Sequence, residues 1–173
     1  MAQTLNIHVD LRALDLLYAI ATHDNWTQIS SQMIDFIPES PLYLRENLCN
    51  KAAVLVQSYG PRDMSSVSLL LKILKIGGKN LARSNGIWRF VAQTVDENRE
   101  IQKEVTEDVY SIVSSAALPT NSLIKLVAFL IGEYIDLCGS FDYQKGVELL
   151  EKLFSDADEE AQSMIAMAMM KIV

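Results

Sequence analysis

The side chains best suited to chemistry are few and scattered along the chain. His8 and His23 each lack a second candidate ligand three or four positions away, so a surface or helix-end histidine is favoured over a metal ligand. Gly77-Gly78-Lys79 lacks the GxxxxGK[ST] spacing of a phosphate-binding loop and is better explained as a helix stop. No GxSxG nucleophile motif occurs. The sequence therefore predicts no enzyme, no metal site and no cofactor.

An acidic run lies near the C-terminal end of the sequence. EF-hand spacing with its central glycine is missing, so a calcium loop is disfavoured. Negative charge at a helix N-terminus stabilises the helix dipole, and Asp156 and Glu159 have the spacing of a capping box. Helix capping is the favoured interpretation. The run consists of Asp156, Asp158, Glu159 and Glu160.

A basic cluster is the one candidate binding site. Lys72, Lys75 and Lys79 follow an i, i+3, i+7 spacing on one helix face, with Arg83 just beyond them and Arg62 before them. A solvated face that suits the negative end of its helix is the favoured interpretation. The alternative is a site for an acidic protein or an anionic lipid headgroup, where each charge contributes about 1 kcal/mol.

Two cysteines and the absence of targeting signals bear on the compartment. Cys49 and Cys138 lie among apolar neighbours and form no spaced framework, so buried free thiols are expected rather than a disulfide. The first ten residues show no signal-peptide pattern. The most apolar helix candidate contains Lys125, Glu133 and Asp136 and is not a membrane span. We expect a soluble, cytosolic protein.

Apolar residues recur with the helical period along nearly the whole chain, and no stretch is a convincing strand. A helix pair with its linkers takes roughly 37 residues, near the ~40–47 typical of HEAT or armadillo repeats. The expected fold is all-α, a right-handed α-solenoid of antiparallel helix pairs. The predicted helices, about nine, are Asp10–His23, Trp26–Ile37, Pro41–Tyr59, Met64–Ile76, Ile87–Val95, Glu97–Ala117, Pro119–Cys138, one capped by Asp142 and reaching Phe154, and Asp156–Val173. Ser40 and Asp63 are the predicted N-caps of the two helices that follow them, and Pro119 with Thr120 opens the helix that ends at Cys138.

One helix separates the solenoid from its alternative, a globular bundle. Pro119–Cys138 is apolar almost all round, so neighbours must cover it on both sides. Several other helices are apolar on one face only, as the outer and inner rows of a solenoid are.

The last helix reaches Val173 with apolar residues and no Gly or Asn cap. We expect residues 1–173 to be a segment of a longer solenoid.

The charge of the chain is unevenly distributed. The 173 residues carry 15 basic and 22 acidic side chains, a net charge of −7. Residues 1–86 hold 8 basic and 7 acidic side chains, net +1, and residues 87–173 hold 7 and 15, net −8. Nucleic-acid binding requires a basic footprint, so a nucleic-acid partner is disfavoured.

Several segments along the chain form a collinear series with characteristic intervals. They are Leu11-Arg12-Ala13-Leu14-Asp15-Leu16-Leu17-Tyr18-Ala19, Leu44-Arg45-Glu46-Asn47-Leu48, Lys51-Ala52-Ala53-Val54-Leu55, Tyr59, Leu70 to Gly78, and Ile131-Gly132-Glu133-Tyr134. This series resembles the trunk of the large adaptins, the large subunits of clathrin adaptor complexes. The alpha-type chain is the most similar and the gamma-type chain the next. The order and intervals match from about residue 9 to 140, and more weakly from Leu149 to Val173.

The resemblance implies a scaffold in vesicle-mediated protein transport. Its partners would be a second large, a medium and a small adaptor subunit, with clathrin and cargo reached indirectly. It also implies a cytoplasmic location, peripheral to the membrane of a coated pit or vesicle. The resemblance assigns no ligand-binding residue to this segment. The alternative is a free-standing helical superhelix of an endocytic accessory protein that binds anionic lipid or cargo.

Overall fold

The computed structural model describes residues 12–13, 15–77 and 86–172, and every regular element within them is helical. Residues 15–19 form part of a first helical segment. The α-helices that follow are α2 (Trp26–Phe36), α3 (Leu42–Tyr59), α4 (Met64–Ile76), α5 (Ile87–Glu97), α6 (Gln102–Ser115), α7 (Asn121–Tyr134), α8 (Tyr143–Phe154) and α9 (Glu159–Ile172), with 3₁₀ turns η1 (Ile37–Glu39) and η3 (Ile135–Leu137).

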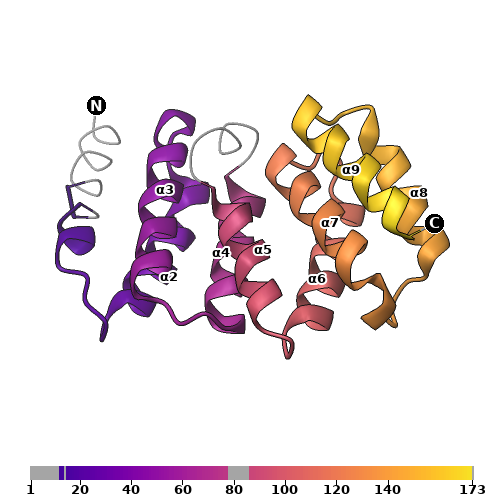
Figure 1. Cartoon of the computed structure of the whole chain (residues 1–173). Coiled ribbons are helices and arrows are strands. Elements are labelled where there is room, and N and C mark those ends of the chain that lie inside the picture. Colours follow the sequence, from indigo (N-terminus) through magenta and orange to yellow (C-terminus); the bar gives the residue numbers. More distant parts are fainter. Residues whose placement is uncertain (1–11, 14, 78–85, 173) are drawn as a thin grey trace.

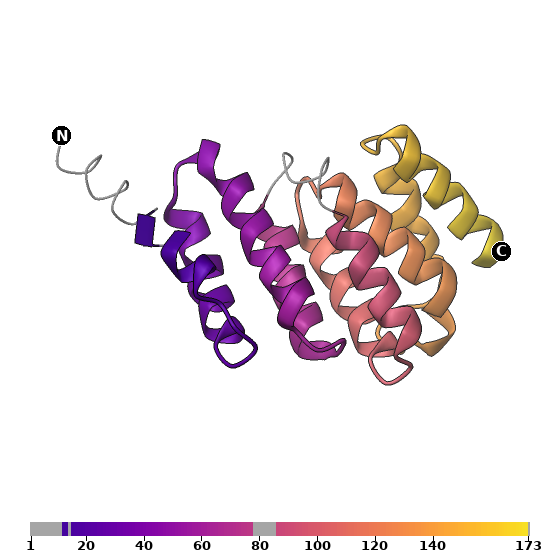
Figure 2. The same ribbon diagram turned by 60° about the vertical axis from the view of Figure 1, so that its left-hand side comes forward.

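The helices stack in a line, with α2 and α3 at one end and α8 and α9 at the other (Figures 1 and 2). Each helix packs against the next one in sequence. Alternate helices also touch, so that α2, α4 and α6 form one row and α5, α7 and α9 form the other. Contacts limited to near neighbours in sequence define a solenoid. The predicted all-α solenoid of HEAT type is confirmed.

Helix α7 lies in the middle of these contacts. It packs against α5 and α9 in its own row and against α6 and α8. Ten of its 14 residues are buried, including Leu126, Leu130 and Ile131 with no exposed surface. The prediction that this helix is covered on both sides is confirmed. Its end differs from the prediction, because the α-helix stops at Tyr134 and continues as the 3₁₀ turn η3.

Local side chains start three helices as the sequence indicates. The Asp63 carboxylate accepts hydrogen bonds from the backbone N–H groups of Ser65 and Ser66 at the start of α4, at 3.0 and 3.3 Å. The Thr120 hydroxyl oxygen caps α7, and the Asp142 carboxylate caps α8. Each cap satisfies a backbone donor that the first helical turn leaves without a partner.

Three further predictions about where helices start or end are wrong. The stretch Glu97–Ala117 is not one helix, because α5 runs on to Glu97 and the chain turns at Asn98, whose side chain accepts from the N–H of Glu100. Helix α6 then begins at Gln102. Ser40 does not cap α3, since its hydroxyl donates backwards to the Ile37 carbonyl oxygen at 2.7 Å.

The third error concerns the last helix. Asp158, and not Asp156, caps α9, and its Oδ1 accepts from the N–H of Ala161 at 2.8 Å. Asp156 lies in the turn before the helix and is exposed. The helix begins at Glu159 and is described as far as Ile172.

Two small residues allow α7 and α9 to approach closely. A Cβ atom added at Gly132 would lie 3.1 Å from both the Cα and the Cβ atom of Ala168, which is tighter than normal van der Waals contact. Ala168 is 3% exposed and faces this contact. A glycine inside a helix costs about 0.5–1 kcal/mol relative to alanine, so close packing must offset that cost here.

Enlarging Ala168 should therefore separate the two helices. We expect Ala168→Leu to lower the free energy of unfolding by about 1–3 kcal/mol, because the larger side chain would press against the backbone of α7 at Gly132. Ala166→Leu is the matched control, since Ala166 lies on the same helix and is exposed. Urea unfolding followed by circular dichroism measures both variants. Equal midpoints for the two variants would contradict this packing.

Candidate functional site

Half of the predicted basic cluster lies in the described part of the chain. Lys72 and Lys75 project from α4, are exposed, and form no ion pair with any described residue. Lys79 and Arg83 lie outside the described residues. Arg62 does not join this surface, because its guanidinium pairs with the carboxylate of Glu97. Of the predicted basic residues that the structure describes, Lys72 and Lys75 lie on one surface.

The histidine and cysteine side chains that the structure describes form no reactive or metal-binding site. His23 lies edge-on to the Tyr59 ring, with centroids 5.1 Å apart, and His8 lies outside the described residues. Cys49 and Cys138 are free thiols, as predicted. Burial raises the pKa of both thiols to about 11, so they are protonated and weakly nucleophilic at neutral pH. No group of three or more metal-ligating side chains occurs among the residues described.

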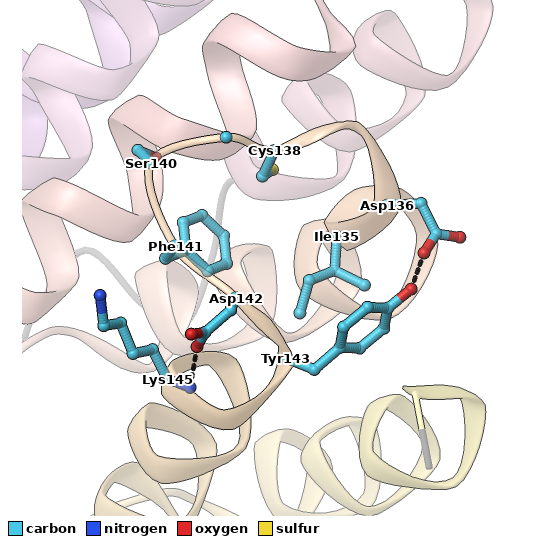
Figure 3. A pocket seen from close by; sticks show the side chains of 9 residues that line it. Ile135, Asp136, Cys138, Ser140, Phe141, Asp142, Tyr143 and Lys145 are labelled. Carbon is cyan, nitrogen blue, oxygen red and sulfur yellow. Dashed lines mark hydrogen bonds between the residues drawn. The ribbon is translucent and has the colours of Figure 1, made fainter.

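A hollow of about 420 Å³ opens beside the turn between α7 and α8 (Figure 3). A second hollow of about 520 Å³ lies along α6, and Ser140 lines both hollows. We call the two together the α6–α8 groove. It is lined by Glu107, Asp108, Tyr110, Ser111, Ser114, Ser115, Ile135, Asp136, Cys138, Gly139, Ser140, Phe141, Asp142, Tyr143 and Lys145.

The wall of this groove is held by a contact that local sequence does not reveal. The Glu107 carboxylate on α6 accepts hydrogen bonds from the N–H groups of Gly139 and Ser140, at 2.7 and 3.0 Å. These backbone donors hold the pKa of Glu107 below its usual range, so the group stays ionised at neutral pH. Beside them the Phe141 ring stacks on Tyr110, with centroids 3.8 Å apart and an angle of 5°.

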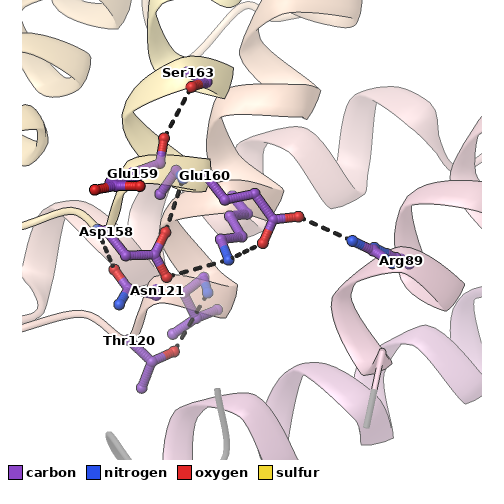
Figure 4. A network of polar contacts seen from close by, with 10 residues as sticks. Arg89, Thr120, Asn121, Asp158, Glu159, Glu160 and Ser163 are labelled. Carbon is purple, nitrogen blue, oxygen red and sulfur yellow. Dashed lines mark hydrogen bonds and ion pairs between the residues drawn. The ribbon is translucent and has the colours of Figure 1, made fainter. Parts of the chain in front are cut away.

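A polar network joins three helices of one row (Figure 4). Lys125 on α7 is only 5% exposed, and its Nζ lies 2.5 Å from Glu160 Oε2 and 3.2 Å from Asp158 Oδ2 on α9. The other oxygen of Glu160 accepts from Arg89 on α5 at 2.9 Å. Asn121 accepts from the N–H of Asp158 at 3.1 Å. A buried ammonium is tolerated only when it is paired, and this one has two carboxylates.

The acidic run therefore has two roles, to cap the start of α9 and to form ion pairs with neighbouring helices. Asp158 caps α9 and Glu160 pairs across the row, while the Glu159 carboxylate has no partner among the described side chains. The hydrogen bond from Lys125, followed by that from Arg89, holds the pKa of Glu160 below its ordinary value of 4.5. The sequence predicts that this run caps a helix, although through Asp156 in place of Asp158. The ion-pair partners of Glu160 lie 35 and 71 residues away and leave no local pattern.

A lowered pKa makes this network sensitive to acid. Because folding lowers the pKa of Glu160, its contribution to stability is present above pH 4.5 and is lost as the pH falls through the lowered value. We expect Glu160→Gln to lower the urea midpoint at neutral pH. The difference from the unmodified chain should disappear well below pH 4.5.

The matched control for this experiment is Glu159→Gln, which removes one negative charge from the same helical turn without breaking an ion pair. Both substitutions weaken the favourable charge at the helix N-terminus by the same amount. Only Glu160→Gln should show the additional loss. Identical pH profiles for the two variants would show that the pairing with Lys125 and Arg89 adds no stability.

Among the residues described, no helix has both the length and the apolar character needed to cross a bilayer.

Comparison with known proteins places the architecture in a family. The chain is 24% identical over 123 residues to the AP-2 complex subunit alpha of Schizosaccharomyces pombe, covering 71% of this chain and 14% of that protein. It is 27% identical over 129 residues to the AP-2 complex subunit alpha-1 of Arabidopsis thaliana, covering 75% and 12%. The AP-1 complex subunit gamma-1 of Arabidopsis thaliana is 25% identical over 126 residues, covering 73% and 14%.

The chain thus spans about one seventh or less of the length of these relatives. Alpha and gamma large subunits both occur among them, in agreement with the resemblance found in the sequence. The model of the family described as "Adaptin N terminal region" matches residues 1–173. Because this match runs along the whole sequence, the chain belongs to the adaptin N-terminal region family.

Proposed function

We propose that this chain is a scaffold segment in the trunk of a clathrin adaptor large subunit. The observation that carries the proposal is the family match along residues 1–173. The relatives compared above are named as subunits of AP-2 or AP-1 complexes, which supports a role in an assembly. In this role the chain binds a second large, a medium and a small subunit, and reaches clathrin and cargo through the complex. It works at the cytoplasmic face of a coated pit or coated vesicle.

The surface of the solenoid supports a role in protein binding. Leu42 and Tyr43 at the start of α3 are 76% and 75% exposed, and Leu118 and Met170 are also largely exposed. Neighbouring exposed apolar side chains, such as Leu42 and Tyr43, are a feature of surfaces that bind other proteins, whereas single exposed ones are ordinary. A solenoid also offers long faces, because its helices stack in one direction (Figure 2).

The transport route follows from the type of large subunit. An alpha-type chain would serve clathrin-mediated endocytosis, and a gamma-type chain would serve sorting at the trans-Golgi network and endosomes. In either case we infer that residues 1–173 are one segment of a longer solenoid. The α7–α9 contact and the polar network then hold consecutive layers of that scaffold in a fixed arrangement.

Assembly tests the proposal directly. We expect the affinity-tagged product of the full-length gene, purified from its source cells, to carry a second large, a medium and a small adaptor subunit in equal amounts. Quantitative mass spectrometry of the purified complex measures this ratio. Recovery of the gene product without any adaptor subunit would contradict the proposal and favour the accessory-protein alternative.

The exposed lysines support a second binding role, at an anionic membrane surface. Lys72 and Lys75 are exposed on one side of α4 and have no acidic partner among the described residues. Lys79 and Arg83 complete the proposed site in the sequence. Basic side chains near an anionic bilayer each contribute about 1 kcal/mol, and salt screens this attraction.

Charge reversal tests the membrane role. We expect the chain to float with phosphatidylserine-containing vesicles at low salt, and Lys72→Glu with Lys75→Glu to weaken this binding about tenfold or more. Lys103→Glu with Lys152→Glu, on α6 and α8, is the control with the same change in net charge. Equal losses in the two double variants would show that net charge alone governs vesicle binding and would remove the proposed site.

A further inference from the structure

The α6–α8 groove is a built surface that the scaffold role does not require. Its two hollows, of about 420 and 520 Å³, share Ser140 of the turn between α7 and α8 in their linings. Glu107 ties that turn to α6 through the N–H groups of Gly139 and Ser140. The stacked rings of Tyr110 and Phe141 fill the space between the helix and the turn. The two walls are thereby fixed relative to each other.

Carboxylates dominate the charge of the groove. The Asp108 side chain has no hydrogen bond or ion pair with any described residue and is exposed. Asp136 accepts from the Tyr143 hydroxyl, and Asp142 accepts from a backbone N–H as the cap of α8 (Figure 3). A carboxylate has about four acceptor positions, so both retain capacity for another donor. Lys145 is the single lysine in the lining, and Lys103 lies near Glu107.

Aromatic and hydroxyl groups accompany these carboxylates. Tyr143 is 48% exposed, so its ring surface is available to a ligand in the first hollow. Tyr110 is half-buried, and Phe141 covers one face of its ring, so only its remaining surface borders the second hollow. Exposed serines line α6 at Ser111 and Ser114. An arginine guanidinium pairs with carboxylates through two parallel hydrogen bonds and stacks on aromatic faces, which an ammonium does less well.

We propose that the α6–α8 groove binds an arginine-bearing segment of another protein chain. Carboxylates at both hollows, aromatic faces beside them and hydroxyls for the peptide backbone match that ligand. Nucleic acid is repelled by the same charges. This inference is independent of which adaptor subunits the chain binds.

Binding of a defined peptide to the 173-residue chain tests the groove. The probe is a fluorescein-labelled peptide of alternating glycine and arginine, and the reference peptide has glutamine in place of each arginine. We expect fluorescence anisotropy to show binding of the arginine peptide and not of the glutamine peptide. Asp108→Asn with Asp136→Asn should weaken binding about fivefold or more, as loss of two partly exposed charge pairs predicts.

The matched control is Glu104→Gln with Glu151→Gln, which removes two carboxylates from α6 and α8 outside the lining. It should change the affinity less than twofold, and thermal unfolding should confirm that both double variants fold. Equal weakening by the two double variants, or equal binding of the glutamine peptide, would overturn the proposal. The proposal would also be overturned if the chain forms a dimer and Asp108→Asn with Asp136→Asn abolishes that dimer. The occupant of the groove would then be a second copy of the chain.

Discussion

Burial of α7 on nearly all sides is the constraint from which the rest of the arrangement follows. A helix with so little solvent-facing surface needs neighbours in its own row and in the other row, and α5, α6, α8 and α9 supply them. The single ammonium that this helix buries, on Lys125, must then be neutralised by the neighbours. Apolar packing and charge pairing therefore require the same placement of α9, and the two requirements agree at Glu160.

Helices and most of their caps follow from short stretches of sequence. The apolar period and the capping residues Asp63, Thr120 and Asp142 act over three or four residues, so they can be recognised without a structure. The solenoid follows as well, because its helix pairs repeat at short intervals. The error at Ser40 arose because its hydroxyl bonds backwards into the 3₁₀ turn, a choice that residue type alone does not determine.

Contacts between distant residues are the part that the sequence could not predict. Asp156 and Asp158 are equivalent as caps by residue type, yet only Asp158 also reaches Lys125 on another helix. The clamp of Glu107 on the Gly139–Ser140 turn joins residues 32 and 33 positions apart. The α6–α8 groove depends on that clamp and on the stacking of Tyr110 with Phe141, so it has no local signature.

The close approach of Gly132 and Ala168 has a consequence for the shape of the solenoid. The distance between two packed helices depends on the side chains at their contact, typically about 8–10 Å between axes. Small residues at one contact bring two helices of the same row closer together, and the stack then curves toward that row. Two residues of small volume therefore set the local curvature. Substitutions at these two positions would change the direction in which the stack continues past this contact, in addition to its stability.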